Sequence, residues 1–152
     1  MSHISVITIT IKDLNALKAA VREFGAEFIE GQRTYAWWGK SVGDTPLPAG
    51  MTNEQLGKCD HCIKVEGVNY EIGVVKTKDG YTLAYDAYNR GAGPNGIRAD
   101  GGKLLAKFGN GLKKLVQSYA LNVAEMKARS AGWLTRRTAL PNGAVKLSLT
   151  GM

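Results

Sequence analysis

The first part of the chain follows the apolar pattern of a β-strand and then that of an amphipathic helix. Residues 3–11 are rich in β-branched side chains and alternate between two faces, as the residues of a strand do. Asp13 suits the cap of a helix whose apolar residues recur at helical spacing until Gly25, where a left-handed backbone is easily adopted. The sequence therefore predicts a strand, a helix and a returning segment over residues 26–29.

The next segment combines a short aromatic strand with a long loop. Residues 34–38 (TYAWW) are typical of a strand, and residues 39–58 are rich in turn-forming residues. A loop of this length is unusual in a compact domain and is often functional. We expect only one helical turn within it, over residues 53–56.

Three consecutive strands form the middle of the chain. Residues 59–65, 70–76 and 81–86 each have the apolar and β-branched composition of a strand, and turn formers separate them. The Asp79-Gly80 pair is the stronger turn signal because it tolerates positive φ. The sequence therefore predicts an antiparallel meander.

The C-terminal third is predicted to contain a glycine-rich loop, a long helix and a hairpin. Residues 89–111 are rich in glycine and basic residues, and an apolar stripe at helical spacing then begins at Leu112. The helix is expected to end near Gly132. Residues 133–140 and 144–149 then form two strands around a Pro-Asn-Gly turn.

Together these elements indicate an α+β fold. Runs of neighbouring strands combined with two helices favour an antiparallel β-sheet, built from the meander and the terminal hairpin, with both helices packed on one face. The length of 152 residues and the hydrophobic content of 44% suit one domain that buries its own core. We therefore expect residues 1–152 to form a single domain, with a long loop at 39–58 and a glycine-rich insert at 89–111.

Positive charge is concentrated in the C-terminal third. Residues 1–97 contain 10 Lys and Arg against 11 Asp and Glu, whereas residues 98–152 contain 10 Lys and Arg against only 2 Asp and Glu. Such a distribution steers polyanions or acidic partners toward the basic part. The alternative is that these residues only solvate a helix face and keep the protein soluble.

Neither export nor membrane insertion is expected from the sequence. It contains no apolar run of the length that a membrane helix requires, and its first residues lack the pattern of a secretory signal. The two cysteines, Cys59 and Cys62, are too few for a secreted disulfide framework. We therefore expect a cytoplasmic protein without a membrane partner.

Five short motifs are spread over most of the chain. They are residues 1–5 (MSHIS), 10–14 (TIKDL), 69–73 (NYEIG), 117–120 (QSYA) and 132–133 (GW). Together they resemble an uncharacterised domain family that occurs in cyanobacteria, in conserved plastid reading frames and in many tailed bacteriophages. The resemblance implies no established activity, cofactor or catalytic residue.

The two long irregular segments separate this chain from the plastid-type members of that family. Residues 39–58 and the insert at 91–102 are more similar to phage-type members. The resemblance therefore implies a phage-encoded protein in the cytoplasm of the host cell. A protein of that origin is expected to act in host takeover or counter-defence, by binding or sequestering something.

The glycine-rich insert imitates two phosphate-binding motifs and completes neither. Residues 91–96 have the spacing G-x-G-x-x-G, but Pro94 and the later glycines prevent the immediate helix start that a dinucleotide site requires. Residues 101–103 (GGK) lack both the upstream glycine and the following Ser or Thr of a P-loop. A more general anion nest of backbone N–H groups and cations is the remaining interpretation, with a flexible loop without a ligand as the alternative. The nest would comprise Arg90, Gly91, Gly93, Arg98, Gly101, Gly102 and Lys103.

Residues 59–62 (CDHC) combine two thiols with a histidine. In a strand the two cysteines point to opposite faces, and the chain has no second cysteine pair for a four-ligand zinc site. His3 is a further ligand only if the first strand lies beside this segment. We therefore expect buried structural cysteines, no metal and no cofactor, with structural zinc or thiol redox chemistry as alternatives.

No group of residues in the sequence combines a nucleophile with a base. His61 is next to Cys62 in the chain, but adjacent strand residues face apart. Asp86 follows a predicted strand, where a carboxylate more often caps a turn than acts as a general base. The protein is therefore expected not to be an enzyme, and no catalytic residue is assigned.

Trp37 and Trp38 are candidates for stacking on a ligand. Alternation places the two rings on opposite faces of the predicted strand, so one is expected to face solvent or a partner. An exposed aromatic ring near a basic surface can stack on a nucleobase. Covering a sheet edge or a subunit interface is the alternative.

The sequence favours a non-enzymatic binding protein that engages an anionic partner, either nucleic acid or a nucleotide, through its basic C-terminal third and glycine-rich loop. The predicted ligand-binding residues are Arg90, Gly91, Gly93, Arg98, Gly101, Gly102, Lys103, Lys107, Lys113, Lys114, Arg136, Arg137, Trp37 and Trp38. One alternative is a protein–protein inhibitor or assembly module with a homo-oligomeric or host-protein interface at the meander edge. The other is a protein that sequesters a small signalling nucleotide between subunits.

Overall fold

Seven strands and three α-helices make up the part of the chain that the computed structural model describes, which is residues 4–39, 47–48, 51–89, 91, 94, 96 and 98–151. In chain order they are β1 (Ile4–Val6), α1 (Leu14–Glu23), β2 (Glu27–Glu30), β3 (His61–Lys64), β4 (Ile72–Lys76), β5 (Tyr81–Asp86), α2 (Gly101–Phe108), α3 (Lys113–Ser130), β6 (Trp133–Ala139) and β7 (Val145–Gly151). Single 3₁₀ turns lie at Asn53–Gln55 and Asn110–Leu112.

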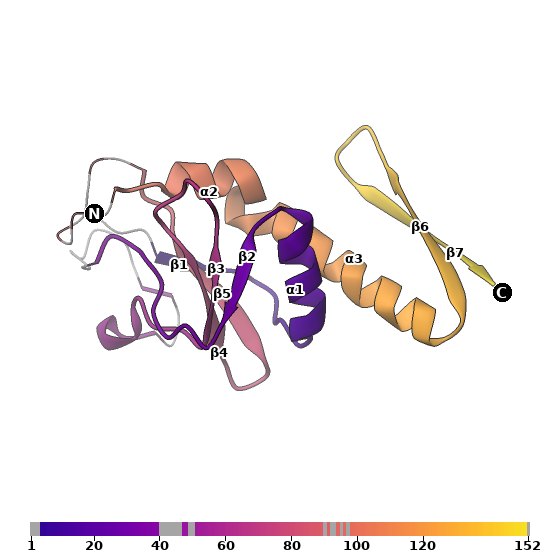
Figure 1. The fold of residues 1–152 in the computed structure, drawn as a ribbon, viewed down its shortest axis with the longest axis horizontal. Coiled ribbons are helices and arrows are strands. Elements are labelled where there is room, and N and C mark those ends of the chain that lie inside the picture. The colour runs from indigo at the N-terminus through magenta and orange to yellow at the C-terminus, as the bar shows by residue number, and fades with distance from the viewer. Residues whose placement is uncertain are drawn as a thin grey trace.

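The strands form two separate antiparallel sheets. Five of them make one sheet in the order β1-β5-β4-β3-β2, and β6 and β7 make a two-stranded sheet (Figure 1). The predicted meander is present as β3, β4 and β5. The predicted α+β fold with an antiparallel sheet is thereby confirmed.

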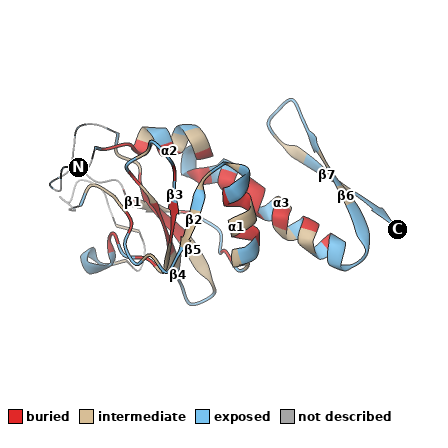
Figure 2. Ribbon diagram, in the orientation of Figure 1, coloured by how far each residue is buried: buried red, intermediate tan, exposed pale blue. Residues whose placement is uncertain are grey.

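One face of the five-stranded sheet packs against the helices. Ile63, Ile72 and Leu83 project from neighbouring strands into an apolar core. Leu17 of α1 and Leu115 of α3 belong to the same core, and all five side chains are fully removed from solvent. Burying a side chain of this size stabilises a fold by roughly 1.5–3 kcal/mol. Figure 2 shows the buried positions on the sheet and on the inward faces of α1 and α3.

The opposite face of the sheet is covered by irregular chain around Tyr35. The Tyr35 ring packs on β4 at Gly73, where an added Cβ atom would lie 2.3 Å from Cδ1 of the ring. The prediction of a strand over residues 34–38 is wrong, because Thr34 forms only a single bridge, to Lys58. The aromatic residues make the segment cross and cover a sheet face instead of joining an edge.

The first strand is shorter than the predicted strand over residues 3–11. β1 ends at Val6, and the chain leaves the sheet before Ile11 forms a single bridge to Tyr81. His3 lies outside the described residues. The β-branched run therefore contributes to the sheet in two short pieces, and Ile9 between them is exposed.

α1 begins and ends as predicted. Oδ1 of Asp13 accepts a hydrogen bond from the N–H of Ala16 at 3.1 Å, and Gly25 has a φ of 68°. The hydroxyl of Tyr119, on α3, accepts hydrogen bonds from the N–H groups of Lys12 at 3.0 Å and Asp13 at 3.2 Å. A side chain of α3 therefore satisfies backbone donors at the start of α1.

α2 lies within residues 89–111, where the sequence predicts only a glycine-rich loop, so three helices are present instead of two. Gly101 and Gly102 are its first two residues, and each lies close to the chain that precedes the helix. An added Cβ atom at Gly101 would lie 2.2 Å from the carbonyl carbon of Ala87, and one at Gly102 would lie 2.4 Å from Nδ2 of Asn89. Close packing explains Gly101, where backbone is the obstruction, whereas Gly102 faces only the side chain of the exposed Asn89.

The terminal hairpin does not extend the five-stranded sheet, contrary to the prediction. Within the described chain β6 and β7 pair only with each other, in a continuous register from Trp133 opposite Gly151 to Ala139 opposite Val145. The hairpin follows α3 and packs along it through β6, beyond the end of the main sheet (Figure 1). It is therefore attached to the rest of the molecule through helices.

The Tyr119→Phe variant should be less stable than the wild-type protein by about 1–2 kcal/mol, because two backbone N–H groups lose their acceptor. Urea unfolding followed by circular dichroism measures this difference. Tyr81→Phe is the matched control, since the structure shows no hydrogen bond from that hydroxyl within the described residues. Equal stability of the two variants would contradict the assignment.

Candidate functional site

The structure distributes the predicted ligand-binding residues over separate parts of the molecule. Arg98, Gly101, Gly102 and Lys103 lie at or just before the start of α2, Lys107 near its end, Lys113 and Lys114 at the start of α3, Arg136 and Arg137 in β6, and Trp37 and Trp38 between β2 and β3. Gly91 lies in the chain before α2, and Arg90 and Gly93 lie outside the described residues. The described residues of this set therefore do not form a single anion site.

The start of α2 has a carboxylate of its own. Asp100 is 2% exposed and accepts a hydrogen bond from the N–H of Asn69 at 2.9 Å. Nε of Arg98 lies 3.4 Å and Nζ of Lys103 lies 4.0 Å from its oxygens. The N–H of Gly101 already donates to a backbone carbonyl at 2.9 Å. The predicted anion nest therefore lacks one of its backbone donors, and its cations are partly neutralised.

Neither tryptophan of the predicted stacking pair is fully exposed. Trp37 packs against Gly57, where an added Cβ atom would lie 2.3 Å from the indole Nε1. Trp38 makes an edge-to-face contact with Tyr88, with ring centroids 5.0 Å apart. Trp133, at the start of β6, is 44% exposed. Both rings are only partly exposed, and the role of Trp37 or Trp38 in stacking on a ligand stays a prediction.

The cysteines of residues 59–62 are buried and have structural contacts. Sγ of Cys59 donates a hydrogen bond to the carbonyl of Gln32 at 3.2 Å, and Cys62 is completely buried in β3. Burial raises the pKa of both thiols, that of Cys59 to about 12. Because the thiolate is the reactive form, this disfavours thiol redox chemistry at neutral pH. Among the described residues, which exclude His3, no group of three or more His, Cys, Asp and Glu is placed to hold a metal ion.

Asp86 connects two irregular segments at the end of β5. Its carboxylate is fully buried and accepts hydrogen bonds from the N–H groups of Trp38 at 2.9 Å and Tyr88 at 3.0 Å. These bonds join the chain after β2 to the chain after β5. The arrangement matches the turn-capping role that a carboxylate at a strand end commonly has.

A groove lies between α3 and the terminal hairpin. Two adjoining cavities, of about 490 and 370 Å³, share Lys114, Gln117 and Gly143 in their walls. Nε2 of Gln117 donates to the carbonyl of Gly143 at 3.4 Å, which places the hairpin turn beside the first turns of α3. The smaller cavity extends to Glu23 and Arg137. We call this feature the α3–hairpin groove.

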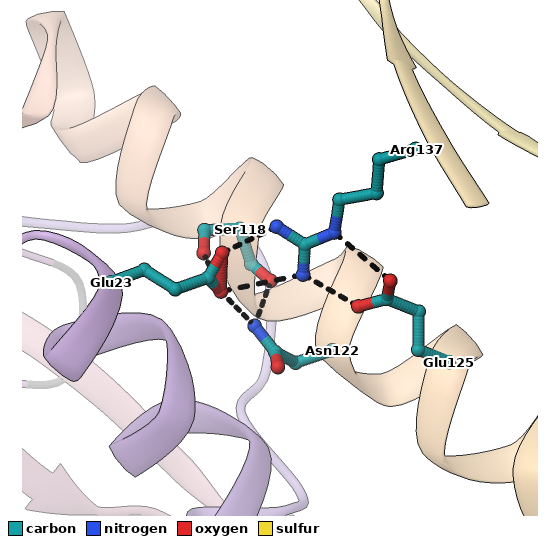
Figure 3. Close-up of polar contacts among 5 residues, drawn as sticks. All are labelled: Glu23, Ser118, Asn122, Glu125 and Arg137. Atoms are coloured by element: carbon teal, nitrogen blue, oxygen red, sulfur yellow. Dashed lines mark hydrogen bonds and ion pairs between the residues drawn. The ribbon is translucent and has the colours of Figure 1, made fainter. Parts of the chain in front are cut away.

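Five polar side chains from three elements meet at one end of the α3–hairpin groove (Figure 3). Arg137 of β6 contacts two carboxylates, with its Nε 3.0 Å from Glu125 of α3 and its guanidinium also paired with Glu23 of α1. Glu23 further accepts hydrogen bonds from Oγ of Ser118 at 2.9 Å and from Nδ2 of Asn122 at 2.5 Å. The network therefore fastens the hairpin to both helices.

The electrostatics of this network favour its charged form. Burial opposes ionisation of Glu23, but hydrogen bonds from Arg137, Asn122 and Ser118 outweigh it and lower the pKa of this carboxyl. Hydrogen bonds to Glu125 and Glu23 raise the pKa of Arg137 above its ordinary value. With both carboxylates on its guanidinium, Arg137 is a structural clamp. It is not available as the phosphate contact that the sequence predicts.

Six other cations of the C-terminal third lack such partners. Lys113, Lys114, Lys127, Arg129, Arg136 and Lys146 are all exposed, and none has a carboxylate within 4.0 Å in the described part of the chain. We call these six residues the basic surface. Lys127, Arg129 and Lys146 were not among the predicted contacts, although the charge count of residues 98–152 includes them. Only the structure distinguishes these free cations from the clamped Arg137.

The solvent face of α3 is basic. Lys113, Ala120, Ala124 and Lys127 are exposed, and their spacing places them on one side of the helix. The two lysines are about 21 Å apart along the axis at a rise of about 1.5 Å per residue. Small alanines between them leave the helix backbone open to the close approach of a partner.

In comparisons with known proteins, no family model, curated protein or solved structure matches this chain. The resemblance to the cyanobacterial, plastid and phage family therefore stays a prediction. None of the described helices is long and apolar enough to cross a membrane.

Replacing Arg137 should destabilise the protein more than replacing its whole ion pair. Arg137→Met leaves Glu125, whose side chain is 9% exposed, without its cation, and should cost about 3 kcal/mol in urea unfolding. Adding Glu125→Gln removes the buried charge and should recover part of that loss. If the double variant is no more stable than Arg137→Met, the clamp does not act as described.

The contribution of the Glu23 carboxylate to the stability of the fold should disappear at acidic pH. Its pKa is lower in the folded protein than its ordinary value of 4.5, so it contributes stability above that pH and loses it as the pH falls through the folded-state pKa. The wild-type protein should therefore exceed Glu23→Gln in stability at pH 7 and approach it at about pH 3. Urea unfolding of both proteins at each pH measures this. A difference that does not change with pH would contradict the assignment.

Proposed function

We propose that this protein is a non-enzymatic nucleic-acid-binding protein whose contacts to phosphate come from the basic surface. One observation carries the proposal: the six exposed cations of this surface have no carboxylate partner in the described chain. An unpaired surface cation is hydrated and exchanges counterions, which makes it a favourable contact for a phosphate. A cation that already neutralises a carboxylate contributes much less to the free energy of binding a phosphate.

The spread of the basic surface favours a polymer over a small ligand. Its residues lie at both ends of α3 and on the outward face of the hairpin, where Arg136 and Lys146 project away from the face that holds Arg137. Lys113 and Lys127 alone span about 21 Å of helix. A mononucleotide is too small to reach cations this far apart, whereas successive phosphates of a strand can do so.

The polar network around Arg137 gives little support to the alternative that the protein is an enzyme. Ser118, the hydroxyl of that network, is buried and donates its hydrogen bond to Glu23. No histidine belongs to the network, and its guanidinium is held by two carboxylates. These groups stabilise one another and offer no activated nucleophile.

A small signalling nucleotide in the α3–hairpin groove is the second candidate. The cavity of about 490 Å³ beside Lys113, Lys114 and Asn142 falls in the size range of small-molecule sites. Such binding would stabilise the fold in proportion to ligand concentration. A panel of mono-, di- and cyclic nucleotides that produces no shift in melting temperature would exclude it.

The proposed binding should be weakened strongly by charge reversal on the basic surface. Lys113→Glu combined with Lys114→Glu should lower the affinity for a fluorescent single-stranded DNA or RNA by at least about tenfold at low salt. The plot of log affinity against log salt should become shallower by roughly 0.7–0.9 per phosphate contact removed. Fluorescence anisotropy measures both quantities.

The matched control carries the same charge change in the first part of the chain. Lys76→Glu combined with Lys78→Glu alters two exposed lysines that lie outside the basic surface. It should lower the affinity by no more than about twofold, in line with long-range screening. Absence of wild-type binding to DNA and RNA at low salt, or equal losses in both variants, would overturn the proposal.

A further inference from the structure

The terminal hairpin has an unusual surface for a protein that acts alone. Of the five exposed large hydrophobic residues in the described chain, four lie on the hairpin or its turn: Trp133, Leu134, Leu140 and Leu149. The hairpin is two strands wide, with both strands mostly exposed in Figure 2. An isolated pair of strands is only marginally stable, and concentrated exposed apolar side chains mark interaction surfaces.

The edges of the five-stranded sheet are short, as free edges commonly are. β1 has three residues, and β2 has four, with Glu27 and Glu30 at its two ends. Short length and charge both discourage pairing with another chain. The meander edge expected from the sequence as an oligomeric interface is not free, because β1 covers β5 and β2 covers β3, and these two outer strands carry features that oppose pairing with another chain.

The outer edge of β7 has few of the features that discourage an edge strand from pairing with another chain. β7 runs for seven residues in unbroken register with β6, and it contains no proline and one charged residue, Lys146. The N–H of Leu140 donates to the carbonyl of Ala144, so hydrogen-bonded pairs with β6 recur at every second residue from there. The N–H and C=O groups of Lys146 and Ser148 therefore face β6. Those of Leu147 and its odd-numbered neighbours face outward without a strand partner in the described chain.

We propose that β7 pairs with β7 of a second copy of this chain, forming a four-stranded antiparallel sheet across a two-fold axis. Alternation along β7 makes the strand self-complementary, with Val145, Leu147 and Leu149 on one face. Pairing about Leu147 or about Ser148 keeps that apolar face continuous between the copies. Leu149, now 51% exposed, then lies opposite Val145 or Leu147 of the second copy.

Charge is compatible with this partner and these registers. In both, Lys146 lies opposite a hydroxyl residue of the second copy, Ser148 or Thr150, and no like charges face each other directly. Pairing through β6 is less favourable, because that strand carries both Arg136 and Arg137 and packs against α3. The outward face of the four-stranded sheet would bring Arg136 and Lys146 of two copies together, which enlarges the surface available to a polyanion.

Sedimentation velocity without nucleic acid tests the dimer. The wild-type protein should form dimers, and Leu149→Lys should raise the dimer dissociation constant by at least about tenfold, because it places a charge in the seam. Leu134→Lys is the matched control: it has similar exposure, at 58%, but lies on β6 and should leave the dimer intact. Both side chains are exposed in one copy, so circular dichroism should show both variants folded.

Hydrogen exchange identifies the paired edge independently of any variant. The backbone N–H groups of Leu147 and Leu149 should exchange more slowly as protein concentration rises, whereas those of Lys146 and Ser148, already bonded to β6, should change little. A wild-type monomer, a dimer that Leu149→Lys leaves intact, or a dimer without this exchange pattern would each overturn the proposal. The Lys113→Glu and Lys114→Glu variant should still dimerise, so failure here is distinct from failure to bind nucleic acid.

Discussion

The position of the terminal hairpin depends on one partly buried guanidinium. Arg137 lies between Glu125 of α3 and Glu23 of α1, and hydrogen bonds from Ser118 and Asn122 satisfy the remaining capacity of Glu23. Partial burial opposes the charges of this network, and the hydrogen bonds among its members outweigh that cost at Glu23. The network also fixes geometry, because another placement of the hairpin would leave Glu125, whose side chain is 9% exposed, without its cation.

The same clamp decides which positive charges remain free. Both carboxylates that reach the hairpin are used by Arg137, and Asp100, the other acidic residue of the C-terminal third, is buried near Arg98 and Lys103. The cations on the outer faces of α3 and the hairpin are therefore left without partners in the described chain. The surface is therefore strongly basic for two reasons: it has many cations, and the few nearby carboxylates are already paired with other residues. We propose that this surface binds a polyanion.

Sequence reasoning succeeded where local chemistry decides the structure. Asp13 caps α1 because its side chain reaches a backbone donor three residues away, and β5 begins and ends at the predicted residues because turn signals and alternation agree there. It failed where contacts between residues that are separated in the sequence decide the structure. Gly101 and Gly102 have the composition of a loop, yet they begin α2, and the backbone of Ala87 leaves no space for a side chain at Gly101.

The sequence by itself determined the α+β class, the meander and the concentration of positive charge after residue 97, since these depend on alternation, turn residues and composition. Only the tertiary structure decided that Trp37 and Trp38 are half-buried, that Arg137 is a clamp and that the hairpin stands apart from the main sheet with an open edge. The physical reason is that charge pairing and burial depend on which residues meet in space. A sequence pattern specifies which residues can ionise or pack, but not which partners they find.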